Sequence, residues 1–245
     1  MSKEITPIAH RGASSYAPEN TFAAFDLAVE MGIGEIELDV HFTKDSQIIV
    51  IHDETLDRTT NSTGSVCDRT LEEIQSLDAG SWFDEKFSGE KVHTLDEVFD
   101  RYKNQLRFHI EIQSKEAEGL ASRTCELVKA YGLEDRTTIT SFWKQWLMES
   151  RSYAPEIPTG WLVPLGYETP WDDSAIEEAL QEGFTQICPR TSAVSPALVQ
   201  TLHDHGFSVR CWGVYNEELM LKAVESGADA MTLNFPDKLK NHLLT

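Results

Sequence analysis

The stretch Ile36-Glu37-Leu38-Asp39-Val40-His41 decides what fold and what chemistry to expect of this chain. Its apolar and β-branched residues predict the C-terminal part of a β-strand. Successive side chains of a strand point to opposite faces, so Glu37 and Asp39 share one face. Two neighbouring carboxylates repel each other and resist burial, which favours a cation between them. The alternative is a solvent-facing strand edge that carries two acids, and the rest of the chain has to decide.

The charge of the chain limits its partners. The 245 residues include 41 acidic and 21 basic ones, which gives a formal net charge of −20. Nucleic acids and anionic membrane surfaces are polyanions, so we expect no nucleic-acid partner and no stable membrane association. A substrate that carries phosphate then needs a local cation or an arginine. The sequence does not fix the oligomeric state.

Cysteine spacing and the termini indicate the compartment. The cysteines are widely scattered and form no C-x-x-C pair, so reduced thiols are expected. The first residues contain no apolar stretch of signal-peptide length. No window approaches the ~18 apolar residues of a membrane span. We therefore expect a soluble, cytoplasmic protein.

Short apolar runs alternate with amphipathic stretches along almost the whole chain, which predicts βα units around a parallel sheet. The predicted strands span residues 5–10, 34–41, 107–113, 137–142, 158–163, 186–189, 208–214 and 230–234. The predicted helices that follow them span residues 21–31, 94–102, 117–131, 144–151, 174–182, 196–205, 217–226 and 237–243.

This pattern predicts an α/β fold, the (β/α)8 TIM barrel, since such barrels typically have ~250 residues. A doubly wound open sheet fits less well, because no Gly-x-Gly-x-x-Gly follows the first strand. Residues 53–92 break the alternation and are rich in Thr, Asp, Gly and Ser. We interpret residues 1–245 as one barrel domain with a small insertion at about 53–92, after the second strand.

In such a barrel the functional residues lie at the C-terminal ends of the strands. Glu111 shares a strand face with Gln113 and supplies a third carboxylate beside Glu37 and Asp39. Three carboxylates and water form a suitable shell for one divalent cation, Mg²⁺ or Ca²⁺, with Mn²⁺ as a further alternative, and suit Zn²⁺ less well.

Two histidines and one arginine complete this set. His10 and His52 each end an apolar run, and an unperturbed pKa of about 6.5 suits general acid and base work. Arg11 offers a forked donor for a phosphate oxygen.

These residues resemble the glycerophosphodiester phosphodiesterase family, in its bacterial cytoplasmic form. The resemblance spans nearly the whole chain in order. The matching pieces are His10-Arg11-Gly12, Pro18-Glu19-Asn20-Thr21, Ile36-Glu37-Leu38-Asp39-Val40, Thr43-Lys44-Asp45, the run from His52 to Asn61, Gly80-Ser81-Trp82-Phe83, Thr94-Leu95-Asp96-Glu97-Val98, Glu111, Ser141-Phe142, Trp212 and Phe235-Pro236-Asp237.

The resemblance implies a TIM barrel and metal-dependent hydrolysis of a small glycerophosphodiester to sn-glycerol 3-phosphate and an alcohol. It implies roles for the site residues, which are metal ligation by Glu37, Asp39 and Glu111, acid/base catalysis by His10 and His52, and substrate contacts by Arg11, Glu19, Phe142 and Trp212. The attacking group is either water or the glycerol 2-hydroxyl, which would first give a cyclic phosphate.

The chain departs from the family pattern at two positions. Gln113 stands where the family usually has lysine, and Leu233-Asn234 stands where it usually has Thr-Asp. Losing the lysine removes a point charge near the phosphate. We therefore expect Gln113 to lie at the substrate site and to weaken phosphate binding or to alter the substrate preference. The rival interpretations are a barrel kept as a binding module and a phospholipase D-like action on lysophospholipids.

Overall fold

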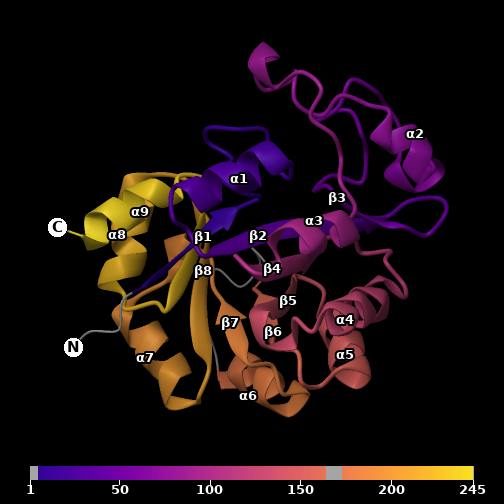
Figure 1. Ribbon diagram of the computed structural model, residues 1–245. Helices are drawn as coiled ribbons and strands as arrows, with labels where there is room; N and C mark the ends of the chain where they lie inside the picture. The colour runs from indigo at the N-terminus through magenta and orange to yellow at the C-terminus, as the bar shows by residue number, and fades with distance from the viewer. Residues whose placement is uncertain (1–4, 164–172, 245) are drawn as a thin grey trace.

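The computed structural model describes residues 5–163 and 173–244 of the chain. Within them, every strand except β3 runs parallel to its neighbours, and the β1–β2 pairing closes the sheet into a barrel. This confirms the predicted TIM barrel (Figure 1). The barrel strands are β1 (Thr6–His10), β2 (Glu35–Phe42), β4 (Arg107–Ile112), β5 (Thr137–Ser141), β6 (Thr159–Leu162), β7 (Gln186–Cys188), β8 (Ser208–Val214) and β9 (Ala230–Leu233).

Helices cover the outside of this barrel. They are α1 (Phe22–Glu30), α3 (Leu95–Tyr102), α4 (Leu120–Tyr131), α5 (Lys144–Tyr153), α6 (Asp173–Glu182), α7 (Pro196–Asp204), α8 (Glu217–Glu225) and α9 (Pro236–Leu243). Thr94 caps α3 in a capping box. Its hydroxyl accepts from the Glu97 backbone N–H, and the Glu97 carboxylate accepts from the Thr94 backbone N–H. None of the helices in the described ranges is long and apolar enough to cross a membrane.

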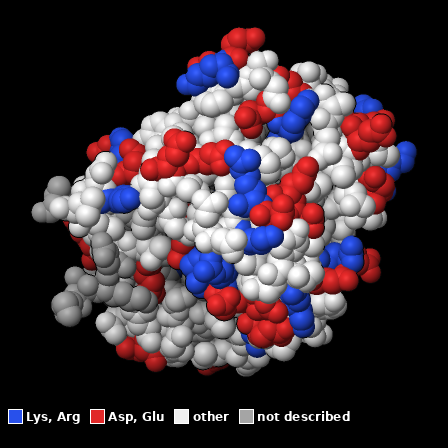
Figure 2. Space-filling view, in the orientation of Figure 1, with Lys and Arg blue, Asp and Glu red and all other residues white. Residues whose placement is uncertain are grey.

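The main hydrophobic core lies between the barrel strands and these helices. Phe99 of α3 packs edge-on against Phe108 of β4, with 5.0 Å between the ring centroids. Both rings are almost fully buried, as is Phe25 of α1. On the outside, Lys and Arg side chains lie beside acidic ones over the face shown in Figure 2. The apolar stripes read from the sequence therefore face the barrel.

The insertion follows β3 (Ile48–Val50), a short strand that pairs antiparallel with β2. It carries α2 (Leu71–Gln75) and extends away from the barrel in Figure 1. It has a small apolar cluster of its own, made by Ile49, Ile51, Leu56, Val66, Ile74, Ala79 and Val92. The assignment of residues 1–245 to a single domain stays our proposal.

Strand register brings the predicted site residues to one end of the barrel. His10 on β1 pairs with Glu37 on β2, and Asp39 on β2 pairs with Glu111 on β4. The three strands that carry these residues are far apart in the sequence, yet neighbouring strands of a sheet lie only about 4.8 Å apart. Barrel closure is therefore what assembles the site.

The turn after β1 depends on Gly12. Its φ is +82°, and an added Cβ would lie 2.7 Å from the backbone carbon of Ala24. Both the left-handed conformation and the close approach to α1 exclude a side chain. Gly89 in the insertion has a φ of +95° but open space around it.

We expect Gly12→Ala to lower the free energy of unfolding by about 3 kcal/mol, because it adds backbone strain to a steric overlap. The matched variant Gly89→Ala should lower it by about 1 kcal/mol, since only the backbone term applies. Urea denaturation of both variants measures the difference. Equal losses would contradict the proposed contact with α1.

Candidate active site

A cavity of about 260 Å³ opens at the C-terminal ends of the barrel strands. Its walls include residues from β1, β2, β4, β8 and the segments that follow β3 and β9. Among them are the predicted residues His10, Arg11, Glu37, His52, Glu111, Gln113, Phe142 and Trp212. The structure thus brings most of the predicted set together.

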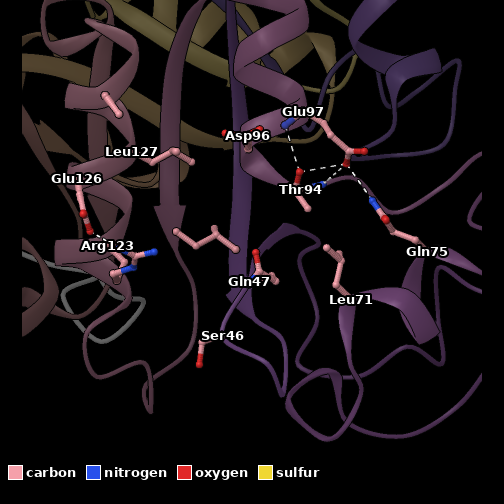
Figure 3. A pocket seen from close by; sticks show the side chains of 12 residues that line it. Ser46, Gln47, Leu71, Gln75, Thr94, Asp96, Glu97, Arg123, Glu126 and Leu127 are labelled. Carbon is pink, nitrogen blue, oxygen red and sulfur yellow. Dashed lines mark hydrogen bonds and ion pairs between the residues drawn. The ribbon is translucent and has the colours of Figure 1, made fainter.

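A larger hollow of about 470 Å³ lies elsewhere, between α2, α3 and α4 (Figure 3). Figure 3 shows that Thr94 Oγ1 and Gln75 Nε2 both donate to Glu97 Oε2 there. Arg123 pairs with Glu126 on the same helix. None of the predicted site residues lines this hollow, so its size carries no functional argument.

Three buried carboxylates cluster at the cavity, where Glu37 and Glu111 line it and Asp39 lies beside them. Oxygens of Glu37, Asp39 and Glu111 all lie within 4.8 Å of one another. One oxygen of each (Oε1, Oδ1 and Oε1) is buried and has no hydrogen-bond partner among residues 5–163 and 173–244. Burial and the charge of Asp39 raise the pKa of Glu37 well above its usual value, and the same causes raise that of Glu111 to about 8. Free acceptors that face one another fit a divalent cation with oxygen ligands.

Two neighbours fix the orientation of Asp39. Asn20 Nδ2 donates to Asp39 Oδ2 at 2.9 Å, and Arg11 Nε forms an ion pair with the same oxygen at 3.2 Å. The backbone N–H of Arg11 also lies 3.2 Å from Glu37 Oε2. No role was predicted for Asn20 from the sequence. The only feature that pointed to it was its place within the matched stretch from Pro18 to Thr21.

His10 is held by the residue that departs from the family pattern. Its Nδ1–H donates to Asn234 Oδ1 at 2.5 Å, and its Nε2 lies 3.9 Å from Glu37 Oε2. Burial and the charge of Arg11 lower the pKa of His10 to about 4. Asn234 therefore keeps the acceptor that an aspartate would offer, but it does not bring the negative charge.

His52 is held by a charged partner instead. Its Nδ1 lies 2.6 Å from Asp53 Oδ1, and hydrogen bonds from Arg58 lower the pKa of Asp53 well below its usual value. An ionised carboxylate only accepts, so His52 carries its proton on Nδ1. Gln113 Nε2 lies 3.1 Å from His52 Nε2 and donates to it. The Nε2 atom of each histidine thus faces the cavity.

Glu19 lies behind the cavity wall and holds two arginines. Arg58 donates to both oxygens of Glu19 at 2.7 and 2.8 Å, and Arg11 Nη1 donates to Glu19 Oε1 at 2.8 Å. Burial raises the pKa of Glu19, but Arg58 and Arg11 outweigh it and lower the value to about 2. Glu19 therefore holds Arg11 and Arg58 in position, and its contact with a substrate stays a prediction. Sequence reasoning missed Asp53 and Arg58, although both lie in the matched run from His52 to Asn61.

Aromatic side chains form the other wall. Phe142 and Trp212 meet edge to face, with 5.0 Å between the ring centroids. Tyr215 also lines the cavity and is 67% exposed, at the mouth. The family resemblance predicted substrate contacts for Phe142 and Trp212, and no role was predicted for Tyr215.

The chain is similar to known proteins over nearly its whole length. Residues 10–238 match the Glycerophosphoryl diester phosphodiesterase family. The chain is 40% identical to a glycerophosphodiester phosphodiesterase from Caldanaerobacter subterraneus subsp. tengcongensis, over 96% of each chain. It superimposes with a TM-score of 0.84 on a glycerophosphodiester phosphodiesterase from Agrobacterium tumefaciens that is 31% identical, covering 97% of this chain and 99% of that one. It also superimposes with a TM-score of 0.85 on a phosphodiesterase from Oleispira antarctica in complex with the product sn-glycerol-3-phosphate, at 27% identity over 98% and 97% of the chains.

The hydrogen bond to Asp53 predicts the tautomer of His52. Nitrogen NMR at about pH 8, where an unperturbed imidazole is neutral, should show the proton of His52 on Nδ1. Asp53→Ala should abolish that preference, because the acceptor is lost. His203, whose Nε2 lies 2.8 Å from Asp229 Oδ2, is the internal control and should not change. An Nδ1-protonated His52 in Asp53→Ala would contradict the role given to Asp53.

Proposed function

The chain belongs to the glycerophosphoryl diester phosphodiesterase family and is a glycerophosphodiester phosphodiesterase, and we propose that it works with one divalent cation and a histidine pair. The reaction adds water to a glycerophosphodiester and releases sn-glycerol 3-phosphate and an alcohol. The observation that carries this proposal is that a cluster of three buried carboxylates, two of which line the cavity, lies at the same cavity as His10 and His52. The product bound by the Oleispira antarctica relative supports the same substrate class.

Glu37, Asp39 and Glu111 would hold the cation, which is Mg²⁺ or Ca²⁺, with Mn²⁺ as an alternative. When bound, such a cation neutralises phosphate oxygens and lowers the pKa of a bound hydroxyl or water. The unpartnered oxygens of these carboxylates support the assignment, because a buried acceptor without a donor destabilises the fold.

We assign a different proton transfer to each histidine, because the partner of one is charged and the partner of the other is neutral. Asp53 is ionised and accepts from His52 Nδ1, so we assign His52 as the general acid, whose Nε2 protonates the leaving alkoxide once the substrate replaces the Gln113 contact. Asn234 is neutral, so His10 starts neutral and takes the proton of the attacking hydroxyl. The new phosphorus–oxygen bond forms as the bond to the alcohol breaks. Water or the glycerol 2-hydroxyl serves as nucleophile.

Magnitudes show that the histidines do not act alone. General acid–base catalysis contributes a factor of roughly 10²–10⁴, or about 3–6 kcal/mol, whereas enzymes typically lower the barrier by about 8–23 kcal/mol. Charge stabilisation at the phosphate and positioning must supply the rest. Arg11 contributes to the first, and the wall made by Phe142 and Trp212 contributes to the second.

Cation dependence is the first test of the proposal. We expect release of sn-glycerol 3-phosphate from glycerophosphocholine and glycerophosphoethanolamine to stop with EDTA and to return with Mg²⁺, Ca²⁺ or Mn²⁺. Glu37→Gln should weaken cation binding by at least about 100-fold, because loss of a ligand exceeds the effect of losing its outer partner. Calorimetric titration of the cation measures this directly.

The matched control for that test is Glu30→Gln, an exposed acid of α1 that should bind the cation as the wild type does. Unchanged binding by Glu37→Gln would remove Glu37 from the ligand set. A folded wild type that releases no product with any ion would favour the binding-module interpretation.

The histidine pair is tested by single substitutions. His10→Ala and His52→Ala should each lower kcat by about 10²–10⁴ and leave the melting temperature nearly unchanged, since the general acid or base is lost and little packing is. His205→Ala, at an exposed position after α7, is the control and should keep full activity. Near-normal turnover by either site variant would exclude that histidine from proton transfer.

A further inference from the structure

Arg210 is a buried arginine of the cavity wall, and two of its donor atoms have no acceptor in the described part of the chain. It lies on β8 opposite Ala230 of β9, is 1% exposed, and lines the cavity. Its guanidinium contacts the thiol of Cys188, which is a weak acceptor. Within residues 5–163 and 173–244, its Nε and Nη1 have no hydrogen-bond partner. An unsatisfied buried donor is costly, and one on a cavity wall indicates a ligand.

Two further polar groups on the same side of the cavity share this property. The indole Nε1 of Trp212 and the hydroxyl of Thr232 are also buried without partners in the described part of the chain, and both residues line the cavity. Trp212 follows Arg210 by two residues and so shares its strand face. Thr232 lies on the adjacent strand β9. We call Arg210, Trp212 and Thr232 the donor wall.

The donor wall shares the cavity with the carboxylate cluster, and the two are chemically complementary. The first offers N–H and O–H groups without acceptors, and the second offers oxygens without donors. A phosphoryl group with its cation fits such a cavity, because its oxygens accept from the wall while the cation meets the carboxylates.

We propose that Arg210 is a second phosphoryl-binding arginine and that the donor wall is the subsite for the anionic oxygens of the substrate and product. This inference rests on the proposed function and deepens it. Arg11 by itself does not fill the phosphoryl-binding role, because its Nη1 already donates to Glu19 and its Nε already pairs with Asp39. Arg210 has two donors, Nε and Nη1, that find no acceptor among the described residues, and phosphate oxygens accept well from a guanidinium.

The rival role for Arg210 is a counter-charge for the carboxylates. Burial works to lower the pKa of Arg210, but Cys188, Glu37 and Glu111 raise it above its usual value. A pure counter-charge would change cation affinity when removed and would leave phosphate affinity unchanged. The two roles are therefore separable by measuring both ligands.

The test is calorimetric titration of sn-glycerol 3-phosphate into the full chain, once with EDTA and once with saturating Mg²⁺. We expect Arg210→Met to weaken binding about 10- to 100-fold, the usual range for a lost charge-assisted hydrogen bond. Arg210→Lys should lie between, because it keeps the charge without the fork. Arg123→Met, an exposed arginine of α4 outside the cavity, is the matched control and should bind as the wild type does.

Circular dichroism and cation titration show whether each variant is folded. If Arg210→Met is unfolded, Arg210→Lys and Trp212→Phe decide, and Trp212→Phe should weaken binding several-fold by losing only the N–H. Wild-type affinity in folded Arg210 variants, or a change confined to the cation, would overturn the inference.

The two proposals fail separately. Product release by the wild type together with Arg210-independent binding would overturn only the donor wall. Arg210-dependent binding by a wild type that releases no product would overturn only the proposed reaction.

Discussion

The mutual repulsion of Glu37, Asp39 and Glu111 is the constraint on which the rest of the site depends. Three carboxylates within 4.8 Å inside a barrel would be ionised at a high cost, which is why burial raises the pKa of Glu37 and Glu111. The surroundings supply positive charge at close range through Arg11, and a cation would supply the rest. The barrel tolerates this arrangement because its strands are fixed on both sides by neighbours and by the outer helices.

A chain of one ion pair and several charge-assisted hydrogen bonds links that cluster to the insertion. It runs from Asp39 through Arg11, Glu19 and Arg58 to Asp53, and so to His52. The segment after β3 therefore does more than extend the barrel, since it supplies one histidine of the site and the arginine that holds its carboxylate. Both ends of the chain orient a functional group, which makes Arg58 a positioning residue.

The two departures from the family pattern have different consequences. Asn234 preserves the acceptor for His10 and removes only a charge, so the geometry of the imidazole is kept. Gln113 removes a cation but donates to His52 Nε2, which caps that atom while no substrate is bound. Arg210, whose Nε and Nη1 have no acceptor among the residues that the structure describes, offers a positive charge from another strand of the same cavity.

The sequence by itself determined the barrel, because the alternation of strands and helices follows from short-range periodicity, whereas several predicted cavity residues came from the family resemblance. Alternation gave the strands and helices within a few residues, Thr94 and Glu97 gave a cap, and strand parity gave the face shared by Glu37 and Asp39. The roles of the site residues remain proposals. Only the tertiary structure revealed Asn20, Arg58 and Arg210, since their importance lies in which groups they meet or fail to meet. The alternation along a strand predicts which face a side chain lies on. The groups that surround Arg210 depend instead on barrel closure, which brings β8 and β9 beside β1 and β2 from the other end of the chain.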